Sequence, residues 1–277
     1  MLDSKLQSEI IAKCRDFMKG TRDDDPYMSE FESDQDLKRP QPPLCNAAVT
    51  PKDTHIPLTR DFSQLALNND LLSLIRDRRS ARVYTNEPLN PDELSFLLWA
   101  TQGVKDIRGK VYATLRTVPC GGARHEFETY LIVRNVAGLK PGRYHYLPME
   151  HALEFLGGIE DICGAIIESL DDQKWAAKAA VVFYWSMTAY RAEWRYGIYA
   201  HRVALIDAGH VGQNLYLACT GLGLGTCGIG AFSHDRTCEL FGLDGDEEYV
   251  VYTAPVGRVR ASDAAKEQAF YNFLNEE

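Results

Sequence analysis

The amino-acid sequence predicts one α+β domain whose central sheet is mostly antiparallel and flanked by helices. Predicted strands and helices follow one another without the regular βαβ rhythm that indicates a parallel sheet. Segments 127–134, 142–147 and 151–156 are short, β-rich and close together, as in an antiparallel meander. Residues 179–187 form a nearly continuous apolar run, as expected for a central strand that is buried on both faces. We see no internal repeat and no second core pattern.

Composition and charge argue against several classes of protein. The chain has 277 residues and a formal net charge of −9, which argues against a general nucleic-acid binder. No apolar run approaches the roughly 18 residues of a membrane helix, and the N-terminus lacks a signal-peptide pattern. The seven cysteines are irregularly spaced and include no CxxC pair. We therefore expect a cytoplasmic protein with reduced thiols and without structural zinc.

The N-terminal part differs from the rest. Residues 5–18 carry apolar side chains at helical spacing and predict a short amphipathic helix. Residues 20–59 are first acidic and then rich in proline, which is typical of an extended arm or of a disordered tail. An ordered arm of this length suits the surface of a second subunit. We accordingly divide the chain into a helix and arm at 1–60 and a domain at 61–277.

The remaining elements follow from local signals. Asn69–Asp77 is a helix candidate, and Asn90 with Pro91 and Glu93 predicts the start of another, which ends near Gly103. Residues 201–222 give the longest helical pattern. Further helices are expected at 159–169, 173–178 and 235–241, and further strands at 226–231 and 249–256. One face of the long helix is predicted to be apolar and carries Val203, Ile206, Val211, Leu215 and Ala218. The helix also contains the small residues Ala208, Gly209 and Gly212, which permit close approach of another helix.

Three motifs suggest chemistry and are set aside. Gly223–Gly228 matches GxGxxG, but it follows a predicted helix and precedes a strand, the reverse of a dinucleotide fingerprint. It therefore predicts a glycine-rich helix end and turn. Asp207 and His210 share a helix face at i, i+3, yet no third metal ligand has matching register, so a hydrogen-bonded pair is favoured. Cys120 has no evident base partner and is not expected to be a nucleophile.

The arginine cluster at 76–82 is the most informative feature. Four arginines fall within seven residues of an acidic protein, and they are either solvated or face an anion. Ser80 lies among them, and a hydroxyl with forked guanidinium groups suits a phosphate. Arg258 follows the last predicted strand and is a second anion-compatible residue. The residues alone indicate an enzyme with an anionic cofactor and leave its reaction open.

Several motifs resemble a known family. The segment Arg78-Arg79-Ser80-Ala81-Arg82, with Tyr84 and Pro88-Leu89, resembles the opening signature of nitroreductase-like flavoenzymes. Further segments resemble their branch of SagB-type dehydrogenases, which includes the azoline oxidases. These segments are 97–104, 119–133, 138–146, 206–218, 221–232 and 255–258. The resemblance covers roughly residues 70–260.

The resemblance implies an FMN-dependent nitroreductase-like fold, a homodimer with flavin at the subunit interface, and a long dimer-interface helix at 201–222. Specific roles follow by motif position. Arg78, Ser80 and Arg258 correspond to phosphate ligands, Arg79 to a neighbour of the ribityl chain, and Arg82 to a cation at the N1–C2=O edge. Gly230 and Ala231 match the backbone that meets flavin N5. The turn of Pro119, Cys120, Gly121 and Gly122 lines the cofactor from the other subunit, and Gln213, Gly228 and Gly257 complete the predicted cofactor-binding set.

Three positions depart from the family pattern. Cys120 stands where serine is usual, and Glu126 stands where proline usually follows the histidine of the same turn. Azoline oxidases carry a Lys-Tyr pair before the long helix, and the nearest match here is Arg195-Tyr196. We take Arg195 and Tyr196 as the catalytic candidates. Because the pKa of arginine stays above about 12, Arg195 is a poor general base, which places azoline oxidation in doubt.

The preferred hypothesis is an FMN-dependent oxidoreductase that takes hydride from NAD(P)H and reduces nitroaromatic or quinone-like acceptors by ping-pong exchange. Tyr196, Phe232 and Trp194 are candidates to stack on the acceptor. The first alternative is a SagB-type dehydrogenase that oxidises an azoline or related ring with oxygen as acceptor. The second is a flavin-binding protein without turnover. No metal and no nucleic acid are expected in any of these cases.

Overall fold

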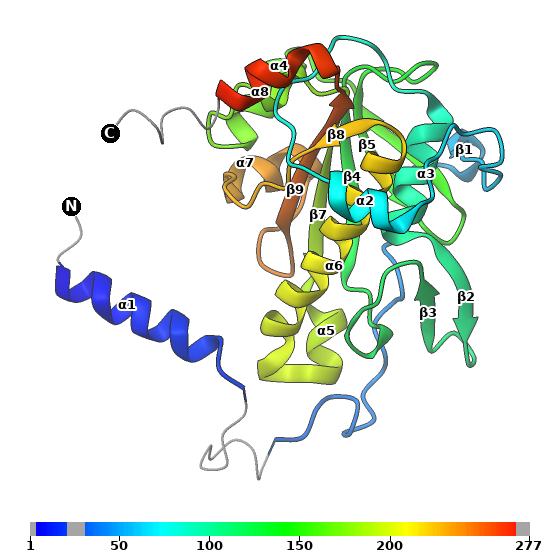
Figure 1. The fold of residues 1–277 in the computed structure, drawn as a ribbon. Helices are drawn as coiled ribbons and strands as arrows, with labels where there is room; N and C mark the ends of the chain where they lie inside the picture. The colour runs from blue at the N-terminus through cyan, green and yellow to red at the C-terminus, as the bar shows by residue number, and fades with distance from the viewer. Residues whose placement is uncertain (1–3, 21–30, 270–277) are drawn as a thin grey trace.

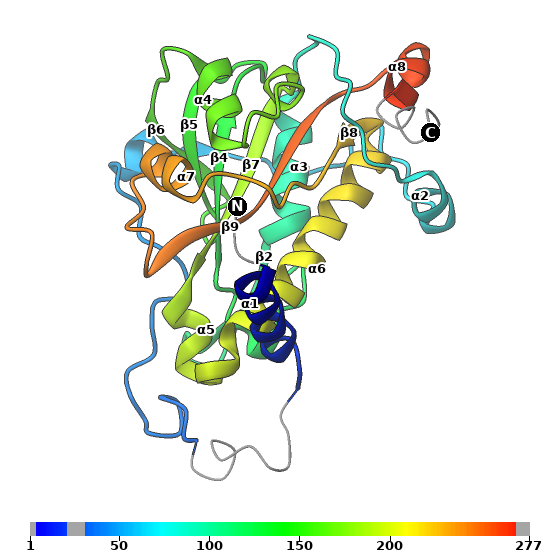
Figure 2. The ribbon, with the colours of Figure 1, turned by 90° about the vertical axis from the view of Figure 1, so that its left-hand side faces the viewer.

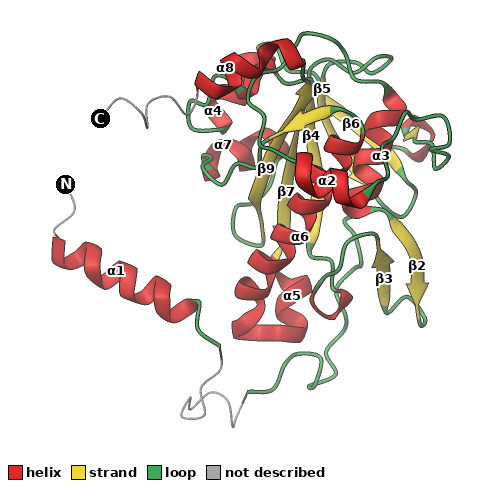
Figure 3. Cartoon of the chain, viewed as in Figure 1, coloured by secondary structure: helices red, strands yellow, loops and turns green. Residues whose placement is uncertain are grey.

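The computed structural model describes residues 4–20 and 31–269. Its helices and strands confirm the predicted α+β class (Figures 1 and 3). The helices are α1 (Ser4–Phe17), α2 (Leu71–Asp77), α3 (Pro91–Gln102), α4 (Ile162–Ser169), α5 (Ala189–Tyr196), α6 (Ala200–Gly221), α7 (His234–Phe241) and α8 (Ala264–Ala269). The strands are β1 (Ile56–Pro57), β2 (Val104–Arg108), β3 (Ala113–Arg116), β4 (Phe127–Val133), β5 (Gly142–Leu147), β6 (Ala152–Gly157), β7 (Val181–Thr188), β8 (Leu224–Thr226) and β9 (Glu248–Arg258).

Seven strands form one sheet in the order β1-β6-β5-β4-β7-β9-β8, and every neighbouring pair is antiparallel. The predicted meander at 127–156 is β4, β5 and β6 in sequence order. The central strand β7 is buried along seven of its eight residues, as its apolar run predicted. Strands β2 and β3 form a separate hairpin.

Helices cover both faces of the sheet (Figure 2). On one face, α3 and α6 contribute to a core with the side chains of Leu131, Phe183 and Trp185. On the other face, Tyr130 and Tyr184 pack into a second core with residues of α4 and α7. Because successive side chains of a strand point to opposite faces, β4 and β7 supply both cores. Helix α1 lies outside these layers (Figure 1), and none of its residues is buried.

Most predicted elements are confirmed, some with corrected bounds. Helix α3 has the predicted capping box: Asn90 accepts from its first turn, and Glu93 accepts from the Asn90 N–H. Gly223, which follows α6, has a φ of +67°, as expected for the glycine-rich end of a helix. The strand predicted at 226–231 was misplaced, since β8 is Leu224–Thr226. The helix predicted at 173–178 is only a short 3-10 turn at Ala176–Lys178.

Five elements were not predicted, namely the short strand β1, the hairpin strands β2 and β3, and the helices α5 and α8. The apolar face of α6 also needs correction, because Ile206 is 57% exposed. The small residue Gly212 packs against the sheet of its own subunit, since a Cβ there would lie 2.5 Å from the Tyr252 ring. The outer side of α6 is instead formed by residues such as Leu205, Ile206 and Gly209.

The described part of the arm lies against its own subunit. Glu128, buried in β4, accepts a hydrogen bond from the Asn46 N–H (2.7 Å). Glu154, buried in β6, accepts from the N–H groups of Val49 and Thr50 (2.9 and 3.0 Å). Two buried carboxylates therefore hold residues 46–50 on the sheet, where the sequence had suggested a partner surface.

The same carboxylates belong to a buried charge network. Glu128 contacts Arg191 of α5 (2.6 Å) and the Nε2 of His145 (3.1 Å), while Glu154 contacts the Nδ1 of His145 (2.8 Å). Burial alone would lower the pKa of His145, but the hydrogen bonds and charges of Glu128 and Glu154 raise it to about 9. The imidazole is therefore a cation between two carboxylates, and the network stays neutralised.

Replacing Glu128 by glutamine tests this network. The substitution leaves Arg191 and His145 without their shared anion, and breaking a buried pair in this way costs about 3–5 kcal/mol. We expect the free energy of unfolding, measured by urea titration, to fall by that amount. The matched control is Glu247→Gln at an exposed position. Equal urea midpoints for Glu128→Gln and the wild type would contradict the network's importance.

Candidate functional site

The arginine cluster joins the edge of the sheet. Helix α2 ends at Asp77, Arg78 caps its C-terminus, and the chain then turns into an extended segment. Ser80 forms a parallel bridge with Thr226 of β8, and the Ala81 N–H donates to the Thr226 carbonyl (2.9 Å). This pairing places Ser80 beside the glycine-rich segment that follows β8.

Tyr216 of α6 links the two segments. Its hydroxyl hydrogen-bonds the Ser80 hydroxyl (2.9 Å) and accepts from the Gly228 N–H (2.7 Å). The Arg78 guanidinium lies 5.2 Å from the centre of the Tyr216 ring. Arg78, Ser80, Tyr216 and Gly228 are called the Tyr216 cluster below. Its chemistry, a cation with hydroxyl and amide groups, suits an anion.

The other arginines have different surroundings. Arg79 is exposed and lines a separate cavity of about 420 Å³ together with Arg260. Arg82 lies 5.9 Å from the Trp175 ring centre, and its N–H donates to the Glu267 carboxylate of α8 (2.9 Å). Arg258 is engaged elsewhere.

The Arg258 guanidinium donates to the Pro88 carbonyl (3.0 Å) and to both oxygens of Glu93 (3.0 and 2.8 Å). It is therefore committed to the start of α3. The phosphate role of Arg258 stays a prediction, and it requires this ion pair to give way.

The glycine-rich segment after β8 is partly open. Gly230 and Ala231 are exposed, and a Cβ built at Gly230 meets no atom of the described chain within 4 Å. By contrast, a Cβ at Gly257 would lie 2.9 Å from the Tyr84 ring, so this glycine permits close packing. Gln213 is exposed on α6. Thus 230–231 can meet a ligand, whereas Gly257 is covered.

The turn at 119–122 lies against both catalytic candidates. Gly122 has a φ of +55°, and a Cβ there would lie 2.5 Å from the Arg195 side chain and 2.8 Å from the Tyr196 hydroxyl. Glycine is therefore required at this contact. The Arg195 guanidinium donates to Gln35 Oε1 (2.8 Å) and to the Tyr112 hydroxyl (3.0 Å). The arm thus helps to hold Arg195 in place.

Trp194 does not share this surface. Its side chain is buried, its indole N–H donates to the Arg39 carbonyl (3.1 Å), and the Arg124 guanidinium lies over its ring. Trp194 is consequently part of the core under the arm. Tyr196 and Phe232 are both partly exposed.

A group of acidic and thiol side chains lies behind the same turn. The Cys120 thiol donates to Glu126 Oε2 (3.2 Å), and Asp207 Oδ2 accepts from the Gly121 N–H (2.8 Å). One ligand-type atom from each of Cys120, Glu126 and Asp207 lies within 4.8 Å of the others. Among the described residues this is the one group with the composition of a metal site. The sequence did not predict it, because Asp207 is 81 residues from Glu126 along the chain.

The first set of residues is the Tyr216 cluster and the second is the 119–122 turn with its neighbours, and the two lie at different positions along α6. Tyr216 belongs to the first set and Asp207 contacts the second, and nine residues of helix separate them by about 13 Å. The structure therefore brings Arg78 and Ser80 to Gly228, and separately brings the 119–122 turn to Arg195 and Tyr196. The sequence did not predict Tyr216 because only the folded chain places its hydroxyl between Ser80 and Gly228.

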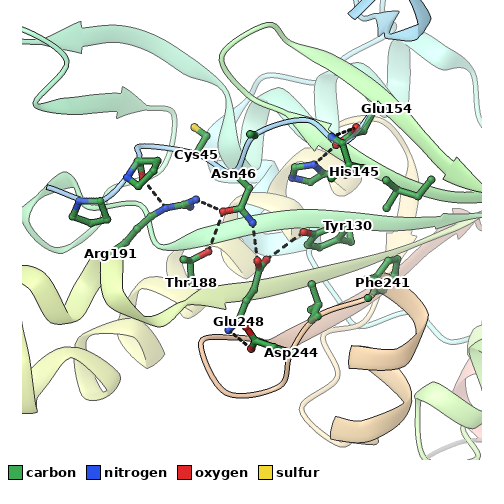
Figure 4. Close-up of a pocket in the computed structure, with 17 residues that line it drawn as sticks. Cys45, Asn46, Tyr130, His145, Glu154, Thr188, Arg191, Phe241, Asp244 and Glu248 are labelled. Atoms are coloured by element: carbon green, nitrogen blue, oxygen red, sulfur yellow. Dashed lines mark hydrogen bonds and ion pairs between the residues drawn. The ribbon is translucent and has the colours of Figure 1, made fainter. Parts of the chain in front are cut away.

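A further cavity of about 570 Å³ lies on the α7 side of the sheet, between the arm and the loop before β9 (Figure 4). Asn46 donates to Glu248 Oε2 (2.7 Å) and accepts from Arg191 (2.6 Å). The Asp244 carboxylate accepts hydrogen bonds from three backbone N–H groups. His145 lies between the carboxylates of Glu128 and Glu154. Since these polar groups satisfy one another, the cavity walls are structural.

Residues 75–258 match the sequence profile of the nitroreductase family. The chain belongs to the nitroreductase family. A protein of Methanocaldococcus jannaschii that bears the name of a nitroreductase is 34% identical over 198 residues, covering 72% of this chain and 93% of that protein. The trifolitoxin-processing protein TfxB of Rhizobium leguminosarum bv. trifolii is 30% identical over 150 residues, which is 48% of this chain and 39% of TfxB.

Solved structures agree with the family fold. A nitroreductase-named protein from Anabaena variabilis has a TM-score of 0.56 at 29% identity, covering 69% of this chain but only 38% of its own. The Escherichia coli microcin synthetase complex McbBCD, with truncated pro-MccB17 bound, contains a chain with a TM-score of 0.56 at 19% identity, covering 91% and 94%. An Exiguobacterium sibiricum protein in complex with FMN has a TM-score of 0.50 at 15% identity, covering 71% and 91%. This chain thus spans most of the archaeal relative and less than half of TfxB and of the cyanobacterial chain.

The family relationship makes this chain a nitroreductase-family flavin oxidoreductase by descent. None of the helices in the described ranges combines the length and apolar character needed to cross a bilayer. The seven cysteines are not paired with one another in the structure.

Cys120 should be an unreactive thiol. Burial, together with the charges of Glu126 and Asp207, raises its pKa far above the usual range, so the thiolate required for alkylation is scarce. We expect iodoacetamide at neutral pH to modify Cys14 and Cys163, which are exposed, well before Cys120. Peptide mass spectrometry over a time course measures the order. Modification of Cys120 first would show that the thiol is activated after all.

Proposed function

We propose that the protein binds FMN and transfers hydride from NAD(P)H to an electron-poor acceptor such as a nitroaromatic or a quinone, by ping-pong exchange at one site. The observation that carries this proposal is the Tyr216 cluster beside the open backbone at 230–231. Together they offer a binding place for an anion and, next to it, amide groups that a planar ring can approach. When bound, FMN supplies a two-electron carrier that accepts and returns hydride. The protein binds it and sets its charge environment.

The donor set fits a phosphate. Arg78 has a partly exposed guanidinium, and the Ser80 hydroxyl is oriented by Tyr216. Forked guanidinium groups and hydroxyls bind phosphate through charge-assisted hydrogen bonds. Arg79, exposed next to them, can follow the ribityl chain. Arg258 joins this set only after releasing Glu93.

The ring environment follows from the same segment. Arg82 is two residues from Ser80, so both side chains point to the same side of the extended chain. A cation at this position stabilises negative charge that develops on the reduced carrier. The N–H groups at Gly230 and Ala231 are solvent-accessible and can donate to a ring nitrogen. Tyr196 and Phe232 remain the candidates for stacking on the acceptor.

A homodimer would complete the site. The Tyr216 cluster and the 119–122 turn are about 13 Å apart along α6. One subunit would therefore supply only part of the residues around a ligand at either place. The outer side of α6 is apolar, with Leu205 48% and Ile206 57% exposed. Pairing two α6 helices about a two-fold axis buries this side and brings the turn of one subunit toward the cluster of the other.

A second function has its own support. TfxB is named as a trifolitoxin-processing protein, and the microcin synthetase chain matches the fold over 91% of this chain, beyond the 75–258 family region. These likenesses favour the SagB-type alternative, in which a substrate ring is oxidised and oxygen accepts the electrons. Tyr196 contacts the 119–122 turn, as such a role needs, but Arg195 beside it cannot remove a proton.

Flavin content tests the binding proposal. We expect purified protein to be yellow, or to become so with added FMN. Arg78→Ala should lose charge-assisted hydrogen bonds of about 1.5–3 kcal/mol, which weakens FMN binding about ten- to a hundredfold. The matched control is Arg76→Ala, because Arg76 pairs with its exposed neighbour Asp77. Flavin titration followed by fluorescence measures both, and equal affinities would contradict the phosphate role of Arg78.

Turnover separates the candidate reactions. The reductase proposal expects the FMN-loaded protein to consume NADH or NADPH when a nitroaromatic or quinone is present. Absence of turnover with both nicotinamides would overturn it. A loaded protein that instead oxidises azoline-containing peptides with oxygen would support the alternative. A loaded protein inactive in both assays would leave only flavin binding.

The molar mass of the protein in solution tests the proposed homodimer. Light scattering of the wild type should give twice the chain mass. Ile206→Glu places a charge on the apolar outer side of α6 and should give a monomer with weakened FMN binding. Lys174→Glu serves as the control, since Lys174 is exposed away from α6. A wild type that is monomeric at micromolar concentration and still binds FMN would contradict an interfacial site.

A further inference from the structure

Asp207 and His210 share one face of α6, and folding brings further ligand-type side chains to that face. In the sequence this pair had no third metal ligand with a matching position. In the folded chain, one ligand-type atom from each of Cys120, Glu126 and Asp207 lies within 4.8 Å of the others. His210 Nδ1 lies 3.6 Å from Asp207 Oδ1. Four side chains of the types that bind zinc therefore meet between the turn and the helix.

The buried carboxylate of Glu126 points to a bound cation. Glu126 is 1% exposed, and its Oε1 has no hydrogen-bond partner in the described parts of the chain. A buried carboxylate oxygen without a donor is costly. Asp207 is also buried, and a second carboxylate within 4.8 Å adds repulsion. A divalent cation removes both costs, because it binds the free oxygen and neutralises the two negative charges.

The spacing of the ligand atoms suits zinc. Zinc binds sulfur at about 2.3 Å and oxygen or nitrogen at about 2.0–2.2 Å in a tetrahedron, so its ligand atoms lie about 3.3–3.6 Å from one another. Cys120 Sγ is 3.2 Å from Glu126 Oε2, and Asp207 Oδ1 is 3.6 Å from His210 Nδ1. A thiolate and an imidazole also favour zinc over magnesium and calcium, which prefer oxygen ligands.

Backbone groups already orient two of these ligands. The Gly121 N–H donates to Asp207 Oδ2 (2.8 Å), and the His125 N–H donates to Cys120 Sγ (3.0 Å). Hydrogen bonds of this kind hold the ligands of metal sites in place. A cation also has a path of entry, since the His210 side chain is 45% exposed and Cys120 is partly exposed. The exposed imidazole can turn toward a metal without displacing core side chains.

We propose that the protein binds a zinc ion between the 119–122 turn and α6, and that this ion holds the turn on the helix. Its ligands are the four side chains described above, namely Cys120, Glu126, Asp207 and His210. On binding, the Cys120 thiol releases its proton to solvent and becomes a thiolate, and His210 binds as a neutral imidazole. The positive ion then faces three anionic ligands, and the charge of Arg116, which acts on Glu126, offsets the remaining negative charge.

The backbone of the turn shows what such an ion stabilises. Ala123 and His125 have φ angles of +55° and +49°, a conformation that is uncommon for residues with a Cβ and costs free energy. Cys120 and Glu126 lie on either side of this strained segment. A metal bound to both therefore stabilises its conformation and keeps the turn against Arg195.

Metal uptake by flavin-free protein tests the site, so the result does not depend on the proposed reaction. Protein stripped with a chelator should take up about one zinc ion per chain in competition with a chromophoric chelator. Cobalt in place of zinc should give the intense visible bands of a tetrahedral site and a thiolate-to-cobalt charge-transfer band. Cys120→Ser should lose the charge-transfer band, and the exposed control Cys163→Ser should keep it. A wild type that binds neither metal, or loss of the band in the control alone, would overturn the proposal.

The other ligands provide a second test. His210→Ala changes only an exposed side chain and should fold, yet its zinc affinity should fall at least tenfold. Asp207→Asn should lose at least as much, whereas His234→Ala, at an exposed position on α7, should match the wild type. Unchanged affinity in either ligand variant would overturn the proposed ligand set.

Hydrogen exchange tests the role of the ion. Amide exchange in residues 120–126, followed by mass spectrometry, should be slower with zinc than after chelation. The His210→Ala variant should need more zinc to reach the same protection. Equal exchange with and without bound zinc would overturn the inference that the ion holds the turn.

Discussion

The buried Glu128 carboxylate is the constraint on which much of the remaining structure depends. A charge in this position is tolerated only when it is paired, and its partners Arg191 and His145 come from α5 and β5. The Asn46 N–H of the arm completes its surroundings. One anion thereby fixes the start of α5 relative to the sheet and holds the arm on both. Helix α5 also carries Arg195 and Tyr196. The placement of these two residues against the 119–122 turn therefore depends on a charge network on the opposite face of the sheet.

Helix α6 connects that region to the arginine cluster. Near its C-terminal end, Tyr216 organises Ser80 and Gly228, and about two turns past its start Asp207 holds the 119–122 turn through the Gly121 N–H. A rigid helix sets a fixed distance between these two places. The cavity of about 570 Å³ lies elsewhere, and polar groups that are already satisfied line much of it. The cavity of about 420 Å³ borders the arginine cluster and is lined by Arg79 and by Thr220 of α6. This separation of two partial surfaces along one helix is the structural reason for the dimer proposed above.

Local signals predicted those parts of the fold whose causes are local. The capping box of Asn90 and Glu93 predicted the start of α3, and the apolar run predicted β7. Both signals depend only on residues that are close together in the sequence. The β2–β3 hairpin is mostly exposed and polar, so it carries no such pattern. The anion site at Arg78–Ser80 follows from local sequence and stays a prediction, whereas Tyr216 and the Cys120–Glu126–Asp207 group could not be found from the sequence. Their members meet only through tertiary packing, and their sequence separations give no periodicity to detect.

The departures from the resembling branch become coherent when they are placed in space. A residue able to take a proton is absent at position 195, because a guanidinium group is a poor general base. On the turn that contacts Arg195, a titratable carboxyl stands at Glu126 and a thiol at Cys120, in direct hydrogen-bond contact with each other. One side of the turn therefore carries no proton-accepting side chain at position 195, and the other carries a thiol that is hydrogen-bonded to a buried carboxyl group. A reaction that removes a proton from its substrate needs the missing base, while one that adds a proton does not. This difference is the chemical argument for the proposed reduction over the ring-oxidation alternative.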